Sequence, residues 1–115
     1  MKPTRIPQAA RQASTGNLAA LEARAGHVAG RLAAMANRKR LLILCRLAEG
    51  EASVGELQAV VGLSQSALSQ HLARLREAGM VATRRQAQTI HYRLSDDETR
   101  AMMAALHDVF CAGAR

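Results

Sequence analysis

The sequence predicts a mainly α-helical winged helix-turn-helix domain with one small β-hairpin, assembled as a homodimer. Two short helical patterns flank a tight turn between residues 53 and 79. The hydrophobic period then changes from that of a helix to that of a strand over residues 80–94. Apolar helical stripes precede and follow this central part, and each has a face that needs a partner. The expected order of elements is α-α-α-α-β-β-α.

Residues 1–17 mix Pro, Gln, Arg and Ser without a hydrophobic period, so we expect a flexible basic N-terminal tail. The DNA-binding and dimerisation domain is expected to occupy residues 18–112. From Leu18 the apolar residues recur at steps of three and four, at Leu21, Ala25, Val28 and Leu32. This is the spacing of a helix that packs along a partner helix, which indicates a subunit interface.

The second helix is expected to start near Asn37 and to end at Gly50. The sequence between them, RKRLLILCRLAE, contains no helix breaker. The inner face of this helix is predicted to carry Leu41, Leu44, Cys45 and Ala48.

The third and fourth helices are predicted from their capping residues. Ser53 followed by Glu56 is a capping box, so the third helix should begin at Val54. Gly62 has the permissive backbone that ends a helix. Ser64 then caps the fourth helix, and the two helices form a helix-turn-helix.

Residues 65–76 of the fourth helix have the composition of a recognition helix for duplex DNA. Leu68, Leu72 and Leu75 lie within a narrow arc. The other side is short, polar and cationic, so it can approach base edges in a major groove and offer them donors and acceptors. The predicted DNA-binding residues of this helix are Gln65, Ser66, Ser69, Gln70 and Arg74. An ordinary amphipathic hairpin with a solvated face is the alternative that this pattern alone leaves open.

A wing should follow the recognition helix, because MVATRR and TIHYRL are strand-like runs joined by a polar tip at residues 86–88. On the return strand Ile90, Tyr92 and Leu94 alternate with polar residues. Arg84 and Arg85 are predicted at the tip and Arg93 on the return strand. Guanidinium groups at a wing suit phosphate or the narrow minor groove, since those contacts need charge and reach.

The last helix is predicted to begin with a second capping box, Ser95 with Glu98, and the acidic Asp96 and Asp97 favour its positive end. Its apolar stripe comprises Met102, Met103, Leu106, Val109 and Phe110. We expect this stripe to pack on the first helix of its own chain and of a second copy.

Composition limits the possible functions. The 115 residues have room for one domain, and the net charge of +7 favours a polyanionic partner. An aromatic content of 2% argues against a platform that stacks single-stranded bases. No apolar run reaches the ~18 residues of a membrane span and the N-terminus lacks a signal-peptide core, so we expect a cytoplasmic protein without a membrane partner. No nucleophile-base pair, phosphate loop or pair of acids has usable spacing, so we expect no enzyme.

The run ANRKRLLILCRLAEGEASVGEL, together with LSQSALSQHLARLREAGMVATRR and TIHYRL, resembles the ArsR/SmtB family of dimeric winged-helix repressors. The resemblance covers residues 18–112 and implies a symmetric dimer, built on the first and last helices, that binds double-stranded operator DNA and releases it with an inducer. The metal-sensing branches have a Cys-x-Cys pair where this chain has Ser53 and Gly55, or a ligand set on the last helix where it offers only His107. No metal or other cofactor is therefore expected.

The two cysteines are similar to those of a narrower subgroup, the SqrR/BigR-type repressors that sense reactive sulfur. Members of that subgroup have one Cys in the second helix and one near the end of the last, as Cys45 and Cys111 are here. This resemblance implies that a persulfide or polysulfide inducer joins Cys45 to Cys111 by a sulfur bridge and weakens DNA binding. His107, one turn before Cys111, is a possible modulator of the thiol, although the negative end of the helix opposes a thiolate there.

Several alternatives stay open at the level of sequence. The thiols of Cys45 and Cys111 could be buried and inert, could form a general redox (disulfide) sensor, or could join His107 in a metal or metalloid sensor. Tetrahedral zinc requires four ligands, and these two cysteines and one histidine supply at most three. A DNA-coating protein without an inducer is a further alternative, but coating needs charge more than a face of Ser and Gln. His27 and His91 are interpreted as surface residues, and His71 as a packing or phosphate-facing residue.

Overall fold

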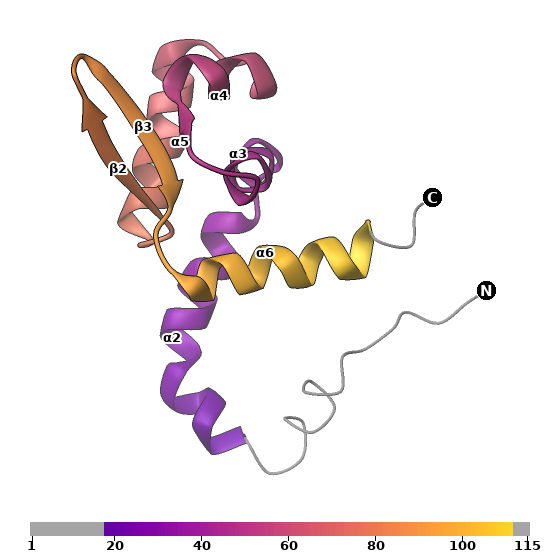
Figure 1. The fold of residues 1–115 in the computed structure, drawn as a ribbon. Helices are drawn as coiled ribbons and strands as arrows, with labels where there is room; N and C mark the ends of the chain where they lie inside the picture. The colour runs from indigo at the N-terminus through magenta and orange to yellow at the C-terminus, as the bar shows by residue number, and fades with distance from the viewer. Residues whose placement is uncertain (1–17, 112–115) are drawn as a thin grey trace.

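The computed structural model describes residues 18–111 as five helices and a three-stranded antiparallel sheet (Figure 1). The elements are α2 (Leu18–Met35), α3 (Arg38–Ala48), β1 (Ala52–Ser53), α4 (Val54–Val61), α5 (Gln65–Glu77), β2 (Val81–Gln86), β3 (Thr89–Leu94) and α6 (Asp97–Phe110). The winged helix-turn-helix order is confirmed, with the short strand β1 as an addition that we had not predicted. The predicted tail, residues 1–17, and the predicted domain end at residue 112 lie outside the described residues.

Local capping explains where the central helices begin and end. The Ser53 Oγ accepts from the Glu56 N–H at 3.2 Å, and the Glu56 carboxylate accepts from the Ser53 N–H at 2.9 Å. Gly62 ends α4 in the left-handed region at φ 67°, and the Ser64 side chain accepts from the Ala67 N–H. These predictions are confirmed, because each depends on residues within one turn of the helix end.

The start of α6 was predicted wrongly. Asp96, not Ser95, is the N-cap, and its Oδ1 accepts from the Thr99 N–H at 2.9 Å. Ser95 instead donates its hydroxyl hydrogen bond to the Gly79 carbonyl. Glu98 is not part of a capping box, because its carboxylate pairs with Arg24 and His27 of α2.

The sheet has the order β1-β3-β2, and β2 and β3 form the wing. Their register runs from Val81 opposite Leu94 to Gln86 opposite Thr89, which leaves residues 87 and 88 as the turn. Ala87 in this turn has a φ of 56°. Strand β1 pairs with β3 through Ala52 and Ser53, so the residue that caps α4 also belongs to the sheet.

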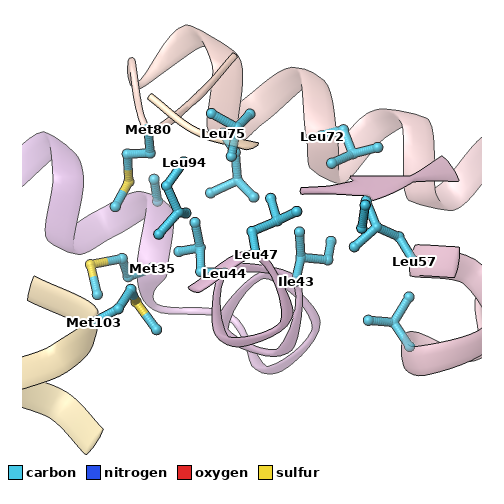
Figure 2. Close-up of a cluster of buried hydrophobic side chains, with 14 of the residues drawn as sticks. Met35, Ile43, Leu44, Leu47, Leu57, Leu72, Leu75, Met80, Leu94 and Met103 are labelled. Carbon is cyan, nitrogen blue, oxygen red and sulfur yellow. The ribbon is translucent and has the colours of Figure 1, made fainter. Parts of the chain in front are cut away.

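The hydrophobic core lies between α3, α5 and the sheet, with one end closed by α6 (Figure 2). The predicted arc of α5 is confirmed, since Leu68, Leu72 and Leu75 are all buried. The predicted inner face of α3 is partly wrong: Leu44 is buried and Leu41 half-buried, but Cys45 and Ala48 are exposed. Ile43 and Leu47 take the buried positions beside Leu44. The run LLIL is apolar on several sides, so its period did not determine which side packs inward.

Helix α6 packs its apolar side chiefly on α3, with Met103 beside Met35 at the end of α2 (Figure 2). Only Met103 of the predicted stripe is buried, whereas Phe110 is 73% exposed. The α2 stripe is also uncovered within the chain, with Leu18 68% exposed. The expected apolar packing of α6 on α2 of the same chain is therefore found only at the end of α2.

A polar junction joins the middle of α2 to the start of α6. Arg31 is buried, and its Nη1 donates to Thr99 Oγ1 at 2.6 Å. Its Nη2 donates to Asp96 Oδ2 at 3.1 Å and to the Gly79 carbonyl at 3.3 Å. These bonds from Arg31, with the backbone bond from Thr99, lower the pKa of Asp96 to about 2. Arg31 thus ties α2 both to α6 and to the turn that ends α5.

His27 lies at the surface, as interpreted from the sequence, and it also belongs to this junction. Its Nε2 lies 2.8 Å from Glu98 Oε2, and Arg24 approaches the same carboxylate at 3.3 Å. The hydrogen bond with His27 is the main reason that the pKa of Glu98 is lowered.

Candidate functional site

Helix α5 presents its predicted DNA-binding face to solvent. Gln65, Ser66, Ser69 and Gln70 are exposed and Arg74 is half-buried. Ser66, Gln70 and Arg74 lie on the side away from the buried leucines, whereas Gln65 is exposed at the start of the helix. The turn before α5 is braced by two side chains: Lys39 Nζ donates to the Val61 carbonyl at 2.6 Å, and Gln58 Nε2 donates to the Leu63 carbonyl at 3.3 Å. The polar face is therefore held on a rigid helix, as readout of base edges requires.

His71 links α5 to α3. Arg40 Nη1 lies 3.3 Å from His71 Nδ1, and Arg40 Nε donates to the Ala34 carbonyl at 2.6 Å. The half-buried imidazole is thus a packing residue on the inner edge of the recognition helix. The sequence left His71 as a packing or a phosphate-facing residue, and its contact with Arg40 supports the packing role.

The wing separates its two neighbouring arginines. Because side chains alternate along a strand, Arg84 lies on the sheet face that carries His91 and Arg93, whereas Arg85 lies on the other face opposite Ile90. Arg85 is exposed and makes no side-chain hydrogen bond within residues 18–111. The hairpin therefore presents cations on both faces.

Arg84 is already engaged within the chain by Glu51, the residue before β1. Its Nε lies 3.1 and 3.2 Å from the two Glu51 oxygens, and its Nη2 also donates to Glu51. Its Nη1 donates to Gln86 Oε1 at 3.2 Å. The hydrogen bonds from Arg84 are the largest cause that lowers the pKa of Glu51. Sequence reasoning missed Glu51, because its role depends on a two-residue strand with no hydrophobic pattern.

The two cysteines line one pocket of about 590 Å³ between α3 and α6. Most of the other residues that line the pocket are apolar. They are Arg38, Leu41, Leu42, Met103, Leu106, His107 and Phe110. A second hollow of about 450 Å³ shares Cys45 and His107 with it. Both thiols are free and both residues are exposed, which contradicts the alternative of two buried inert thiols.

The electrostatics of the pocket distinguish Cys45. Partial desolvation raises the pKa of the Cys45 thiol above its ordinary value, and Coulombic repulsion from Cys111 and Glu49 raises it further. A raised pKa lowers the thiolate fraction at neutral pH. His107 lines the same pocket, and its carbonyl accepts from the Cys111 N–H at 2.8 Å, so the backbone of α6 holds Cys111 at the helix end.

Two further findings concern the described part of the chain. Within residues 18–111, no three side chains of His, Cys, Asp or Glu are grouped so that they could hold a metal ion. None of the five helices combines the length and the apolar character that crossing a membrane requires.

Comparison with known proteins identifies the group to which this arrangement belongs. The family model described as "Bacterial regulatory protein, arsR family" matches residues 37–83, from the cap of α3 into the wing. The transcriptional activator HlyU of Vibrio cholerae is 52% identical over 95 residues, covering 83% of this chain and 88% of HlyU. The chain belongs to the arsR family of bacterial regulatory proteins. A biofilm growth-associated repressor of Agrobacterium fabrum is 50% identical over 95 residues, covering 83% of this chain and 81% of the repressor.

Solved structures agree with the arsR-family fold. Reduced HlyU from Vibrio cholerae superposes with a TM-score of 0.76 at 51% identity, covering 82% of this chain and 99% of that one. The repressor BigR from Xylella fastidiosa superposes with a TM-score of 0.74 at 44% identity, covering 80% of this chain and 94% of BigR. The homodimeric winged helix-turn-helix domain Mb0332 from Mycobacterium bovis gives 0.70 at 29% identity, with 81% and 86% covered. The predicted membership of the ArsR/SmtB family is confirmed: this arsR-family protein is a DNA-binding transcriptional regulator and not an enzyme.

Proposed function

We propose that this regulator is a cytoplasmic, homodimeric repressor that binds double-stranded operator DNA and releases it when a persulfide or polysulfide joins Cys45 to Cys111. The observation that carries the proposal is that both thiols line one apolar pocket between α3 and α6. The relatives named as repressors support the direction of regulation. Desolvation is the main cause of the raised pKa of Cys45, and Cys111 contributes to it, which supports two thiols that lie near each other in this pocket.

The exposed apolar side chains of α2 and α6 support the homodimer. Leu21 and Leu32 are 55% and 53% exposed on α2, and Val109 and Phe110 are exposed near the end of α6. Uncovered stripes of this kind mark interfaces in small domains. The homodimeric relative from Mycobacterium bovis has the same fold. Two recognition helices related by the dimer axis would address half-sites roughly 34–36 Å apart on an imperfect palindrome.

The polar face of α5 supports sequence-specific binding. Gln65, Ser66, Ser69, Gln70 and Arg74 would contact base edges in the major groove, while Arg85 would contact phosphate from the wing. Arg84 is the second arginine of β2, and its contribution to DNA affinity depends on its pairing with Glu51. Replacing Gln70 by Ala should cost ~1–3 kcal/mol at one operator position and reduce the preference for operator over random DNA. An unchanged preference would mean that the recognition face lies elsewhere on α5.

The proposed chemistry is sulfur transfer followed by bridge formation. A cysteine thiolate attacks the outer sulfur of RS–SH, which gives a cysteine persulfide and RS⁻. The second thiolate then attacks the inner sulfur of that persulfide, which gives a Cys45–S–S–Cys111 bridge and expels HS⁻. If both cysteines are persulfides first, their reaction gives a three-sulfur bridge and H₂S. Because both cysteines are exposed, a persulfide from solvent could reach either thiol in the pocket.

A bridge between α3 and α6 would fix the relative position of these two helices. Helix α3 packs on the recognition helix, and α6 is a predicted dimer helix. Fixing one against the other would therefore change the spacing of the two recognition helices in the dimer and weaken operator binding.

The decisive experiment follows operator release and intact mass together. Reduced wild type, Cys45→Ser and Cys111→Ser are each treated with glutathione persulfide, and binding is followed by mobility shift. Wild type should leave the operator with the mass of an intrachain bridge, and both variants should stay bound. Release of either variant would reject the bridge as the switch.

Two other sensing chemistries are outcomes of the same assay. Equal release of wild type by hydrogen peroxide would favour a general redox (disulfide) sensor. Release by stoichiometric zinc or arsenite, with persulfide inert, would favour a metal or metalloid sensor that uses Cys45, Cys111 and His107.

A further inference from the structure

Glu51 pairs with Arg84, a wing cation that could otherwise contact DNA. All three nitrogens of the Arg84 guanidinium donate hydrogen bonds within the chain, two of them to the Glu51 carboxylate and one to Gln86. The paired geometry of a guanidinium with a carboxylate is the same fork that an arginine uses on a phosphate. The Glu51 carboxylate therefore fills the position on the Arg84 guanidinium at which two phosphate oxygens would bind.

The sheet register explains why Glu51 pairs with Arg84 and not with the neighbouring Arg85. Arg84, His91 and Ser53 lie side by side across β2, β3 and β1, so residues two positions away along β1 share their face. Glu51 lies two residues before Ser53, which brings its carboxylate beside Arg84 on this face. Arg85 is on the opposite face and cannot share the same carboxylate.

The charges around Glu51 keep it ionised. Arg84 lowers its pKa most, through hydrogen bonds and charge, and His91 and Arg93 lower it further. The carboxylate thus keeps its negative charge at neutral pH, and it would repel a phosphate brought to the same face.

We infer that Glu51 withholds Arg84 from the DNA backbone, so that the wing contacts phosphate through Arg85 and the overall affinity for DNA stays below what the two arginines together would give. The inference rests on DNA binding by the chain and is independent of the thiol switch. Both partners of the pair are partly exposed, with side chains 46% and 31% accessible, so removing Glu51 frees Arg84 without opening the core. Exposed ion pairs of this kind change an equilibrium constant by at most about fivefold.

The test is a double-mutant cycle on the reduced full-length protein. Wild type, Glu51→Gln, Arg84→Gln and the double variant are titrated with operator and with random duplex at several salt concentrations. Glu51→Gln should tighten binding to both duplexes by about two- to fivefold and steepen the salt slope by about 0.9, the value of one added phosphate contact. Arg84→Gln alone should change affinity less than about twofold, whereas in the Glu51→Gln background it should remove the whole gain.

Glu49→Gln is the matched control, because Glu49 carries the same charge in the same loop and its side chain forms no ion pair among residues 18–111. It should leave the salt slope unchanged. A large loss of affinity for Arg84→Gln in the wild-type background would overturn the inference, since Arg84 would then already contact phosphate. Unchanged or weaker binding by Glu51→Gln would also overturn it, since Glu51 would then only position the wing.

Discussion

Replacing Arg31 by Met tests how much the polar junction stabilises the fold. The variant loses hydrogen bonds to Asp96, Thr99 and Gly79, and hydrogen bonds that involve a charged group contribute roughly 1.5–3 kcal/mol each. Two effects offset this loss. The Nε of Arg31 is buried without a partner, and the Asp96 side chain is 42% exposed and can be rehydrated. We therefore expect the free energy of unfolding to fall by about 2–3 kcal/mol, below the ~3–5 kcal/mol of a fully buried broken pair.

Urea denaturation at one fixed protein concentration measures this change, because the stability of the proposed dimer would depend on concentration. Arg24→Met is the matched control: Arg24 is on the same helix and pairs with Glu98, but its side chain is 61% exposed. It should stay within about 0.5 kcal/mol of wild type. If Arg31→Met were as stable as Arg24→Met, the buried arginine would contribute nothing net, and the junction could not hold α6 to α2.

Three further predictions follow from backbone and charge. Gly62→Ala should lower the free energy of unfolding by about 1 kcal/mol, because the backbone at Gly62 has a φ of 67°. Gly30→Ala should raise it by up to about 1 kcal/mol, because an added Cβ within α2 meets open space. Thermal melts of the two variants and wild type measure both changes. Ala87→Gly should stabilise the wing by about 0.5 kcal/mol, measured as slower hydrogen exchange of the β2–β3 amides. Since the folded pKa of Asp96 is about 2, below its ordinary 3.8, its charge stabilises the fold above pH 4 and loses this effect as the pH falls through 2. After discounting for exposure this is about 1 kcal/mol, and the stability difference between wild type and Asp96→Asn should shrink over that range in acid-titrated urea melts.

Local signals predicted the centre of the fold well. Ser53 and Glu56 satisfy each other within one turn, and Gly62 ends α4 through its own backbone, so neither depends on distant residues. The start of α6 shows the limit of this reasoning. Ser95 and Asp96 are both acceptable caps, and the choice is made by Arg31, which binds Asp96 from a helix more than sixty residues earlier.

Long-range contacts account for what the sequence could not predict. The apolar run of α3 permitted several inner faces, and packing against α4, α5 and α6 selected the one that contains Ile43 and Leu47. The partners of Arg31 and Glu51 are distant in sequence and follow no spacing rule. The exposed face of α5 was predictable from its period, since it is what remains after Leu68, Leu72 and Leu75 are buried.

Strand β1 has a consequence for anyone who recombines this regulator with its relatives. Ser53 is at once the last residue of β1, paired with β3, and the cap of α4. A chimera that took its helix-turn-helix from one parent and its wing from another would join β1 and β3 from different sequences. It would also separate Glu51 from Arg84. The exchangeable module is therefore the whole segment 51–94, because a junction inside it would break the β1–β3 pairing or the Glu51–Arg84 pair.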